Sequence, residues 1–146
     1  MCEDEFLNTA SKLLQSSDGK KIILPVDFGV SNDILSSSRV DKPLELIEST
    51  DIGVDISSKS VALFNEIIHS SNTIFWNGPM GVFENKSFEY GTREITKSVS
   101  QSNAYTVVGG GDSVSAINKY SEIQNFNHIS TGCLLYTSDA ADDVYC

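Results

Sequence analysis

Apolar side chains recur three and four positions apart near the start of the chain, at Phe6, Leu7, Ala10, Leu13 and Leu14. This spacing predicts an amphipathic helix over residues 3–15, and the polar residues 17–19 end it. Residues 21–27 (KIILPVD) are a short apolar run, which predicts a strand buried on both faces of a sheet.

The next stretch has a weaker pattern. Residues 28–42 are rich in serine and show no clear period, so we expect a surface loop there. A short strand around Leu46 is expected within residues 43–54.

The second half of the chain alternates between helical and strand patterns. Helices are predicted over residues 57–71, 87–101 and 112–120, with Ser57 or Ser58 as the N-cap of the first. Short β-branched or aromatic runs predict strands over residues 73–76 (TIFW), 105–108 (YTVV) and 127–130. Such alternation is typical of right-handed β-α-β units. The predicted fold is therefore α/β, a Rossmann-like three-layer parallel sheet with helices on both faces.

Composition and charge exclude several kinds of protein. The chain has 146 residues, 40% of them hydrophobic and 21% charged, as in ordinary globular proteins. Its formal net charge of −10 disfavours binding to nucleic acid or to an anionic membrane surface. No apolar run is as long as a membrane span, and the first residues are acidic, unlike those of a signal peptide. We therefore expect a cytoplasmic protein, with an organellar isoform left open.

The cysteines and histidines do not indicate a disulfide framework or a metal site built on them. Cys2, Cys133 and Cys146 are odd in number and lack C-x-x-C spacing, and His69 and His128 lie far apart in the sequence.

The segment VVGGGDS, residues 107–113, lies at a predicted strand-to-helix junction. Glycines allow the backbone to approach a ligand closely, and a helix start offers free N–H groups to a phosphate. Asp112 could reach a cation, and Ser113 could donate to a phosphate oxygen. An ordinary tight turn with Asp112 or Ser113 as N-cap explains the same residues equally well.

The segment WNGPMGVFE, residues 76–84, follows another predicted strand. Taken alone, it is a rigid turn with core residues and one solvated acid. Asn77, two glycines, the apolar Val82 and the carboxylate of Glu84 are also what a nucleoside and its phosphates would use.

Two common phosphate loops are excluded by their spacing. A G-x-G-x-x-G motif from Gly109 would need glycine where the chain has Val114, and no Walker motif is present. The glycine loop itself holds no Lys or Arg, and Lys119 is the nearest one downstream.

Four segments together resemble the C-terminal, nucleotide-binding domain of the phosphoglycerate kinase family. They are ILPVDF (residues 23–28), WNGPMGVFE (76–84), GGGDS (109–113) and HISTG (128–132). The resemblance implies a phosphotransferase that moves a phosphoryl group between 1,3-bisphosphoglycerate and ADP in glycolysis, giving 3-phosphoglycerate and ATP. Because the family has a further N-terminal domain, the resemblance makes this chain a fragment, which we expect to be inactive alone.

The resemblance also implies roles for individual residues. Asn77 and Gly78 would approach the nucleotide phosphates, Pro79 and Val82 would line the nucleoside pocket, and Glu84 would hold the ribose hydroxyls. The backbone of Gly110, Gly111 and Gly132 and the side chain of Ser113 would cradle phosphate, and Asp112 would hold Mg²⁺. The phosphoglycerate substrate would bind through the missing N-terminal domain, and the parent enzyme would be a monomer.

The end of the chain departs from the family. After Gly132 the sequence CLLYTSDAADDVYC resembles a translated sequencing adaptor. We therefore expect residues 1–132 to be a partial nucleotide-binding domain and residues 133–146 to be a non-native tail.

Two other functions stay open from the sequence. One is a catalytically inactive, stand-alone nucleotide-binding module. The other is an unrelated α/β protein such as a dehydrogenase cofactor domain, which the absent G-x-G-x-x-G motif disfavours.

Overall fold

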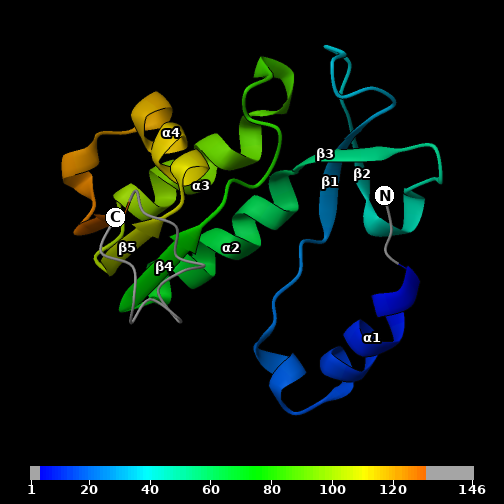
Figure 1. The fold of residues 1–146 in the computed structure, drawn as a ribbon, viewed down its shortest axis with the longest axis horizontal. Coiled ribbons are helices and arrows are strands. Elements are labelled where there is room, and N and C mark those ends of the chain that lie inside the picture. The colour runs from blue at the N-terminus through cyan, green and yellow to red at the C-terminus, as the bar shows by residue number, and fades with distance from the viewer. Residues whose placement is uncertain (1–3, 131–146) are drawn as a thin grey trace, which may run out of the picture.

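A computed structural model describes residues 4–130 of the chain, and these residues contain two separate three-stranded sheets (Figure 1). The α-helices are α1 (Leu7–Gln15), α2 (Ser58–Ser70), α3 (Tyr90–Ser100) and α4 (Gly111–Tyr120). The strands are β1 (Asp27–Ser31), β2 (Val40–Pro43), β3 (Ile52–Ile56), β4 (Thr73–Asn77), β5 (Tyr105–Gly109) and β6 (His128–Ser130). Five short 3-10 helices lie at Asp4–Phe6, Asp18–Lys21, Leu44–Leu46, Lys86–Phe88 and Ile123–Asn125. Among the described residues, no helix is both long and apolar enough to cross a membrane.

The parallel sheet has the order β4-β5-β6, and it confirms the predicted α/β class with flanking helices. Both crossovers advance in the same direction across the sheet, so right-handed connections place α3 and α4 on the same face. On this face the core cluster includes Trp76, Ile95, Val108 and Ile117.

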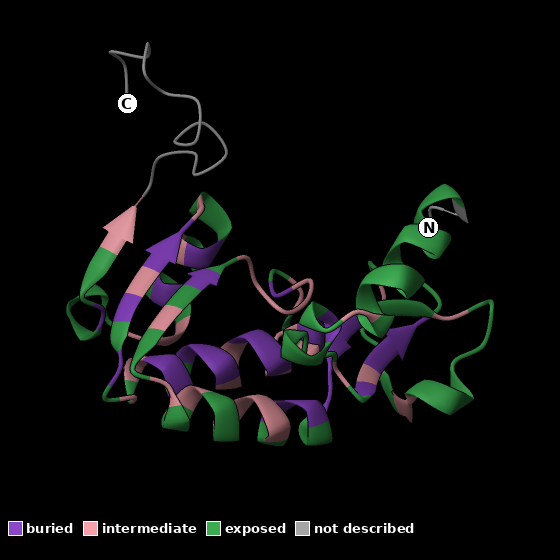
Figure 2. Ribbon diagram, turned by 90° about the horizontal axis from the view of Figure 1, so that it is seen from below, coloured by how far each residue is buried: buried purple, intermediate pink, exposed green. Residues whose placement is uncertain are grey.

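The opposite face of the parallel sheet is open in the part of the chain that the structure describes. Phe75 and Tyr105 are 59% and 54% exposed there, and Figure 2 shows exposed residues on the strands of this sheet. Within residues 4–130, helices therefore cover one face of the parallel sheet and leave the other face open.

The first half of the chain differs from its predictions. The expected strand at residues 21–27 is wrong, because β1 begins only at Asp27 and Ile23 and Leu24 before it are exposed. The expected strand around Leu46 is also wrong, and the expected surface loop is confirmed only for residues 32–39, which are irregular and mostly exposed. Residues 28–42 contribute to β1 and β2, which pair antiparallel, and Leu46 ends a 3-10 helix. Strand β1 also pairs antiparallel with β3, so the small sheet has the order β2-β1-β3.

The first helix forms where it was predicted, but it does not bury its apolar stripe. Every residue of α1 is exposed, including Leu7 and Leu13, and the helix lies apart from α2, α3 and α4 (Figure 1). The remaining helices and the three parallel strands lie within a few residues of their predicted positions.

Asp27 connects the small sheet to the start of α2. Its carboxylate accepts hydrogen bonds from the Lys59 and Ser60 N–H groups at 2.9 and 2.7 Å, and from the Ser60 hydroxyl at 2.6 Å. Ser57 occupies the N-cap position as predicted, but its own side chain makes no capping hydrogen bond. The cap is therefore supplied by a residue 30 positions earlier in the chain, since Asp27 satisfies N–H groups of the first turn.

Replacing Asp27 by Asn is expected to lower the free energy of unfolding by about 1–3 kcal/mol, because one side of the amide would present N–H groups to the helix N–H groups. Burial acts to raise the pKa of Asp27, but hydrogen bonds from Ser60 and Lys59 outweigh it, so this pKa is lowered. The stabilisation is therefore present above the ordinary carboxyl pKa and is lost as the pH falls through the lowered value. Denaturant unfolding across pH measures both effects.

The matched control is Glu66→Gln on the exposed surface of α2, which removes the same charge. Equal unfolding curves for the two variants at neutral pH would contradict the capping role of Asp27.

Candidate functional site at the carboxyl edge of the parallel sheet

Strands β4 and β5 end side by side, so the two segments selected from the sequence meet at one edge of the sheet. The register pairs Asn77 with Gly109. A Cβ added to Gly110 would lie 2.8 Å from the Asn77 side-chain oxygen. The sequence predicted this juxtaposition, because ligand sites of α/β sheets lie beyond the carboxyl ends of the strands.

Glycine provides the backbone conformation at both strand ends. Gly78 has φ +102° and Gly110 has φ +89°. Residues other than glycine rarely adopt such backbone angles. These two residues turn the chain sharply out of β4 and β5.

A buried hydrogen bond joins the two loops. The Gly78 N–H donates to the Ser113 hydroxyl at 2.7 Å, and Ser113 is fully buried. The sequence had suggested that Ser113 would donate to phosphate or cap α4. In this structure its oxygen accepts a hydrogen bond from the neighbouring loop.

The start of α4 offers donors to an anion. Gly110 is the N-cap residue, and the first intrahelical hydrogen bond runs from the Val114 N–H to the Gly110 carbonyl. The N–H groups of the preceding residues, Gly111 among them, therefore have no acceptor within the helix, and the positive end of the helix dipole lies there. Asp112 is exposed in this first turn.

The loop of residues 78–84 packs tightly against β3. The Val82 N–H donates to the Val54 carbonyl at 2.9 Å. A Cβ on Gly81 would lie 2.5 Å from that same carbonyl oxygen, so only glycine fits there without a shift of the loop. The Met80 N–H donates to the Thr92 hydroxyl at 3.1 Å, which ties the loop to α3 as well.

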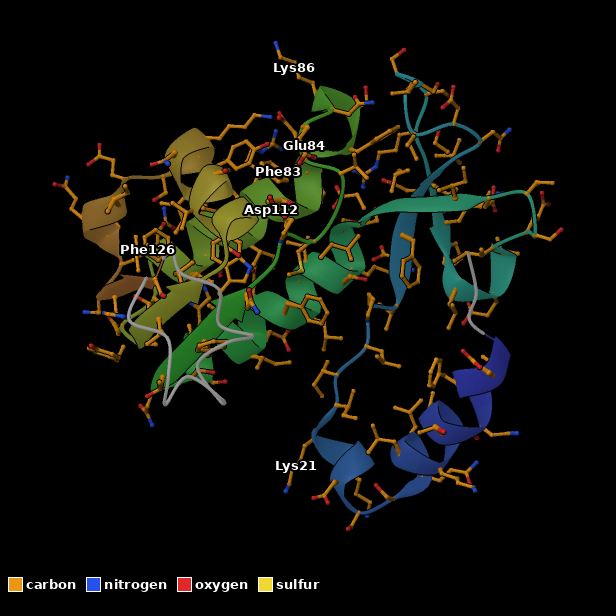
Figure 3. All side chains as sticks on the ribbon, viewed as in Figure 1. Lys21, Phe83, Glu84, Lys86, Asp112 and Phe126 are labelled. Carbon is orange, nitrogen blue, oxygen red and sulfur yellow. The ribbon has the colours of Figure 1, made fainter. Side chains whose placement is uncertain are left out.

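The potential ligand groups on this loop face outward to different degrees. Asn77 and Glu84 are exposed, whereas Pro79 and Val82 are partly buried. Figure 3 labels Glu84 and Phe83, which end this loop, and Asp112, which lies in the first turn of α4. An exposed carboxylate beside a partly buried apolar shelf is suited to a ligand with both hydroxyl groups and a flat apolar ring.

A single magnesium ligand fits the donor set that the structure describes. Within residues 4–130, no three His, Cys, Asp or Glu side chains come together as a metal-binding group. Mg²⁺ bound with a nucleotide takes one or two carboxylates and completes its shell with phosphate oxygens and waters. The exposed carboxylate of Asp112 is compatible with that role.

Sequence reasoning missed three polar residues behind the loop, Glu89, Lys119 and Tyr120. Lys119 was noted only as the basic residue nearest to the glycine segment. In the structure its ammonium group contacts the Phe83 carbonyl oxygen at 2.8 Å and Glu89 at 2.9 Å. These contacts join residues that are 30 and 36 positions apart, and no local motif marks them.

Gly132, which the sequence also suggested for the phosphate site, lies outside the described residues.

Known proteins are similar to this chain over most of its length. A family model described as phosphoglycerate kinase matches residues 1–135. The chain belongs to the phosphoglycerate kinase family. It is 44% identical over 136 residues to phosphoglycerate kinase of Finegoldia magna, which covers 90% of this chain and 34% of the relative. It is 42% identical over 134 residues to that of Salinispora tropica, covering 90% and 33%.

Solved phosphoglycerate kinase structures have the same fold. The structure from Coxiella burnetii superposes with a TM-score of 0.82 at 33% identity, covering 89% of this chain and 34% of that one. The structure from Pyrococcus horikoshii gives a TM-score of 0.72 at 35% identity, covering 88% and 31%. The chain thus spans about a third of the length of the phosphoglycerate kinases it matches.

Replacing Ser113 by Ala is expected to lower the free energy of unfolding by about 1–3 kcal/mol, because the Gly78 N–H would lose its buried acceptor. Trp76 reports the change locally, since its indole N–H donates to the Gly78 carbonyl at 2.7 Å. Its emission is expected to shift in Ser113→Ala. Ser115→Ala serves as control, because Ser115 is exposed and donates only to the Gly111 carbonyl. Indistinguishable emission and stability in the two variants would refute the link.

Proposed function

We propose that this chain forms part of the nucleotide-binding half of a phosphoglycerate kinase and binds ADP or ATP with Mg²⁺ at the carboxyl edge of β4 and β5. The supporting observation is the hydrogen bond from Gly78 to Ser113, which joins the two family segments into one continuous edge. Membership of the phosphoglycerate kinase family supports the same assignment.

Each candidate residue has a role at this edge. Asn77, Gly78 and the backbone of Gly110 and Gly111 face the phosphates, and Pro79 and Val82 contact the nucleoside. Glu84 accepts hydrogen bonds from the ribose hydroxyls. Ser113 supports phosphate binding by holding the Gly78 loop against the start of α4.

Asp112 holds the magnesium ion of the nucleotide. When bound, Mg²⁺ neutralises charge on the nucleotide phosphates. Phosphoryl transfer depends mainly on positioning and charge stabilisation rather than on covalent steps by the protein. An edge of glycine backbone that also offers the exposed carboxylates of Glu84 and Asp112 is suited to hold the nucleotide in place.

The whole enzyme transfers phosphoryl between 1,3-bisphosphoglycerate and ADP, giving 3-phosphoglycerate and ATP in glycolysis in the cytoplasm, and acts as a monomer. The phosphoglycerate site belongs to the N-terminal domain of the family. The 146-residue chain is therefore expected to bind nucleotide without turnover. Residues 1–132 form the partial domain, and residues 133–146, which lie outside the described residues, are a non-native tail.

Nucleotide binding by the chain is expected to be visible in Trp76 emission, because Trp76 is the only tryptophan and contacts Gly78. ADP with Mg²⁺ should change this emission and saturate at or below about 1 mM, the upper end of common KM values. The control ligand is inorganic tripolyphosphate, which has phosphates but no nucleoside. No change in emission with ADP at that concentration would contradict the proposed function.

Two carboxylate variants are expected to lose different parts of nucleotide binding. Glu84→Gln should weaken ADP about tenfold or more and leave tripolyphosphate unchanged, because a hydrogen bond to a charged group is worth about 1.5–3 kcal/mol. Asp112→Asn should instead abolish the gain in affinity that Mg²⁺ brings. Titrations with and without Mg²⁺ separate these effects, and the exposed Glu66→Gln variant is the charge-matched control. Identical losses in both site variants would refute the assigned roles.

A further inference from the structure

A polar cluster of Glu89, Lys119 and Tyr120 lies directly behind the loop of residues 78–84. Lys119, in the last turn of α4, donates from Nζ to the Phe83 carbonyl at 2.8 Å and pairs with Glu89 Oε2 at 2.9 Å. The Tyr120 hydroxyl donates to the same Glu89 oxygen at 2.9 Å and lies 3.3 Å from the same carbonyl oxygen. The Phe83 carbonyl of the loop is thus held by Lys119, with the Tyr120 hydroxyl beside it.

The cluster also holds the ring of Phe83. Phe83 is 5% exposed, and its ring meets the Tyr120 ring edge to face with centroids 6.5 Å apart. The Lys119 ammonium lies 5.8 Å from the centroid of the Phe83 ring, within the range of a cation–π contact. Both the backbone and the side chain of Phe83 are therefore fixed from the α4 side, and Glu84 is the next residue.

The loop also makes neutral hydrogen bonds with Val54, Trp76, Thr92 and Ser113. The contact from Lys119 is different, because a hydrogen bond from a charged donor is roughly twice as strong as a neutral one. It is also the contact that comes directly before Glu84 in the chain. Removing it should loosen the end of the loop that carries the ribose carboxylate.

The charge of Lys119 is already used within the protein. Hydrogen bonding with Tyr120 and the nearby Glu89 carboxylate raises the pKa of Lys119, so the ammonium stays protonated at neutral pH. Burial acts to raise the pKa of Glu89, but hydrogen bonds from Lys119 and Tyr120 outweigh it and lower this pKa. Two of the three N–H donors of Lys119 are directed at the Phe83 carbonyl and at Glu89.

We infer that Lys119, supported by Glu89 and Tyr120, is a positioning residue that fixes residues 82–84 for the nucleoside of the bound nucleotide. It acts through the Phe83 carbonyl and does not touch the ligand. The inference rests on the proposed nucleotide site and adds to it the residues that set the placement of Glu84.

The test compares Lys119→Met with Lys119→Arg in the 146-residue chain. Lys119→Met keeps the aliphatic stem and removes the donors, and is expected to weaken ADP about five- to tenfold while leaving tripolyphosphate unchanged. Lys119→Arg keeps a cationic donor and is expected to restore most of the affinity. A direct phosphate contact would instead weaken both ligands, and that result would overturn the inference.

Lys97→Met is the matched control. Lys97 also lies in the last turn of a helix, pairs with a neighbouring acid and has a side chain 47% exposed, against 36% for Lys119. It is expected to leave ADP affinity unchanged. Tyr120→Phe, which removes one hydroxyl, is expected to give a smaller loss than Lys119→Met and covers the case in which Lys119→Met folds poorly. Equal ADP affinity in Lys119→Met and Lys97→Met would overturn the inference.

Hydrogen exchange without nucleotide separates this inference from the proposed function. Amides of residues 82–85 are expected to exchange faster in Lys119→Met than in the wild type, while those of β5 are unchanged. If the wild type binds no ADP, the proposed function fails, and the exchange result still decides whether Lys119 holds the loop. Equal exchange in both proteins overturns the inference whatever ADP does.

Discussion

The arrangement of the candidate site depends on the hydrogen bonds that the buried carboxylate of Asp55 accepts. It accepts hydrogen bonds from Arg39 at 2.7 Å, from the Gly91 N–H at 2.8 Å and from the Ile56 N–H at 2.9 Å, and its side chain is fully buried. These contacts bind β3 to the start of α3. The loop of residues 78–84 packs against Val54, the residue before Asp55, through the hydrogen bond from the Val82 N–H to the Val54 carbonyl. Burial raises the pKa of Asp55 despite the neighbouring donors. Desolvation therefore offsets much of what the ion pair contributes, so its main effect is on geometry.

The parallel half of the fold could be predicted because its signals are local. Each strand, such as TIFW or YTVV, is a short run of β-branched and aromatic residues followed closely by a turn and a helix. The antiparallel half could not, because β1 and β2 (DFGVS and VDKP) contain glycine, proline and acids. They become strands through pairing across the chain, for example Asp27 with Pro43. The strongly apolar run KIILPV, residues 21–26, precedes β1, and Ile23 and Leu24 within it are exposed. It has no partner strand within residues 4–130, and an apolar pattern by itself does not supply a partner strand.

The candidate site divides in the same way. Glycines, the strand ends and the exposed carboxylates of Glu84 and Asp112 follow from sequence spacing, because they depend on local turns. The placement of Ser113 against Gly78, 35 residues away, depends on how β4 and β5 pair. Lys119 and Phe83, 36 residues apart, meet only because α3 and α4 pack on one face of the sheet. Neither Lys119 nor Glu89 belongs to a sequence motif, so the sequence alone does not reveal that they pair.

The distribution of charge at this edge bears on which part of a nucleotide gives selectivity. The proposed phosphate end consists of backbone N–H groups and the positive end of the α4 dipole, which attract any anion of suitable size. The proposed nucleoside end consists of the exposed Glu84 and the partly buried Pro79 and Val82. Lys119 adds its charge to the support of that end, because its ammonium contacts the loop carbonyl and Glu89. If this edge binds a nucleotide as proposed, its discrimination against a simple polyphosphate depends on how firmly residues 78–84 are held.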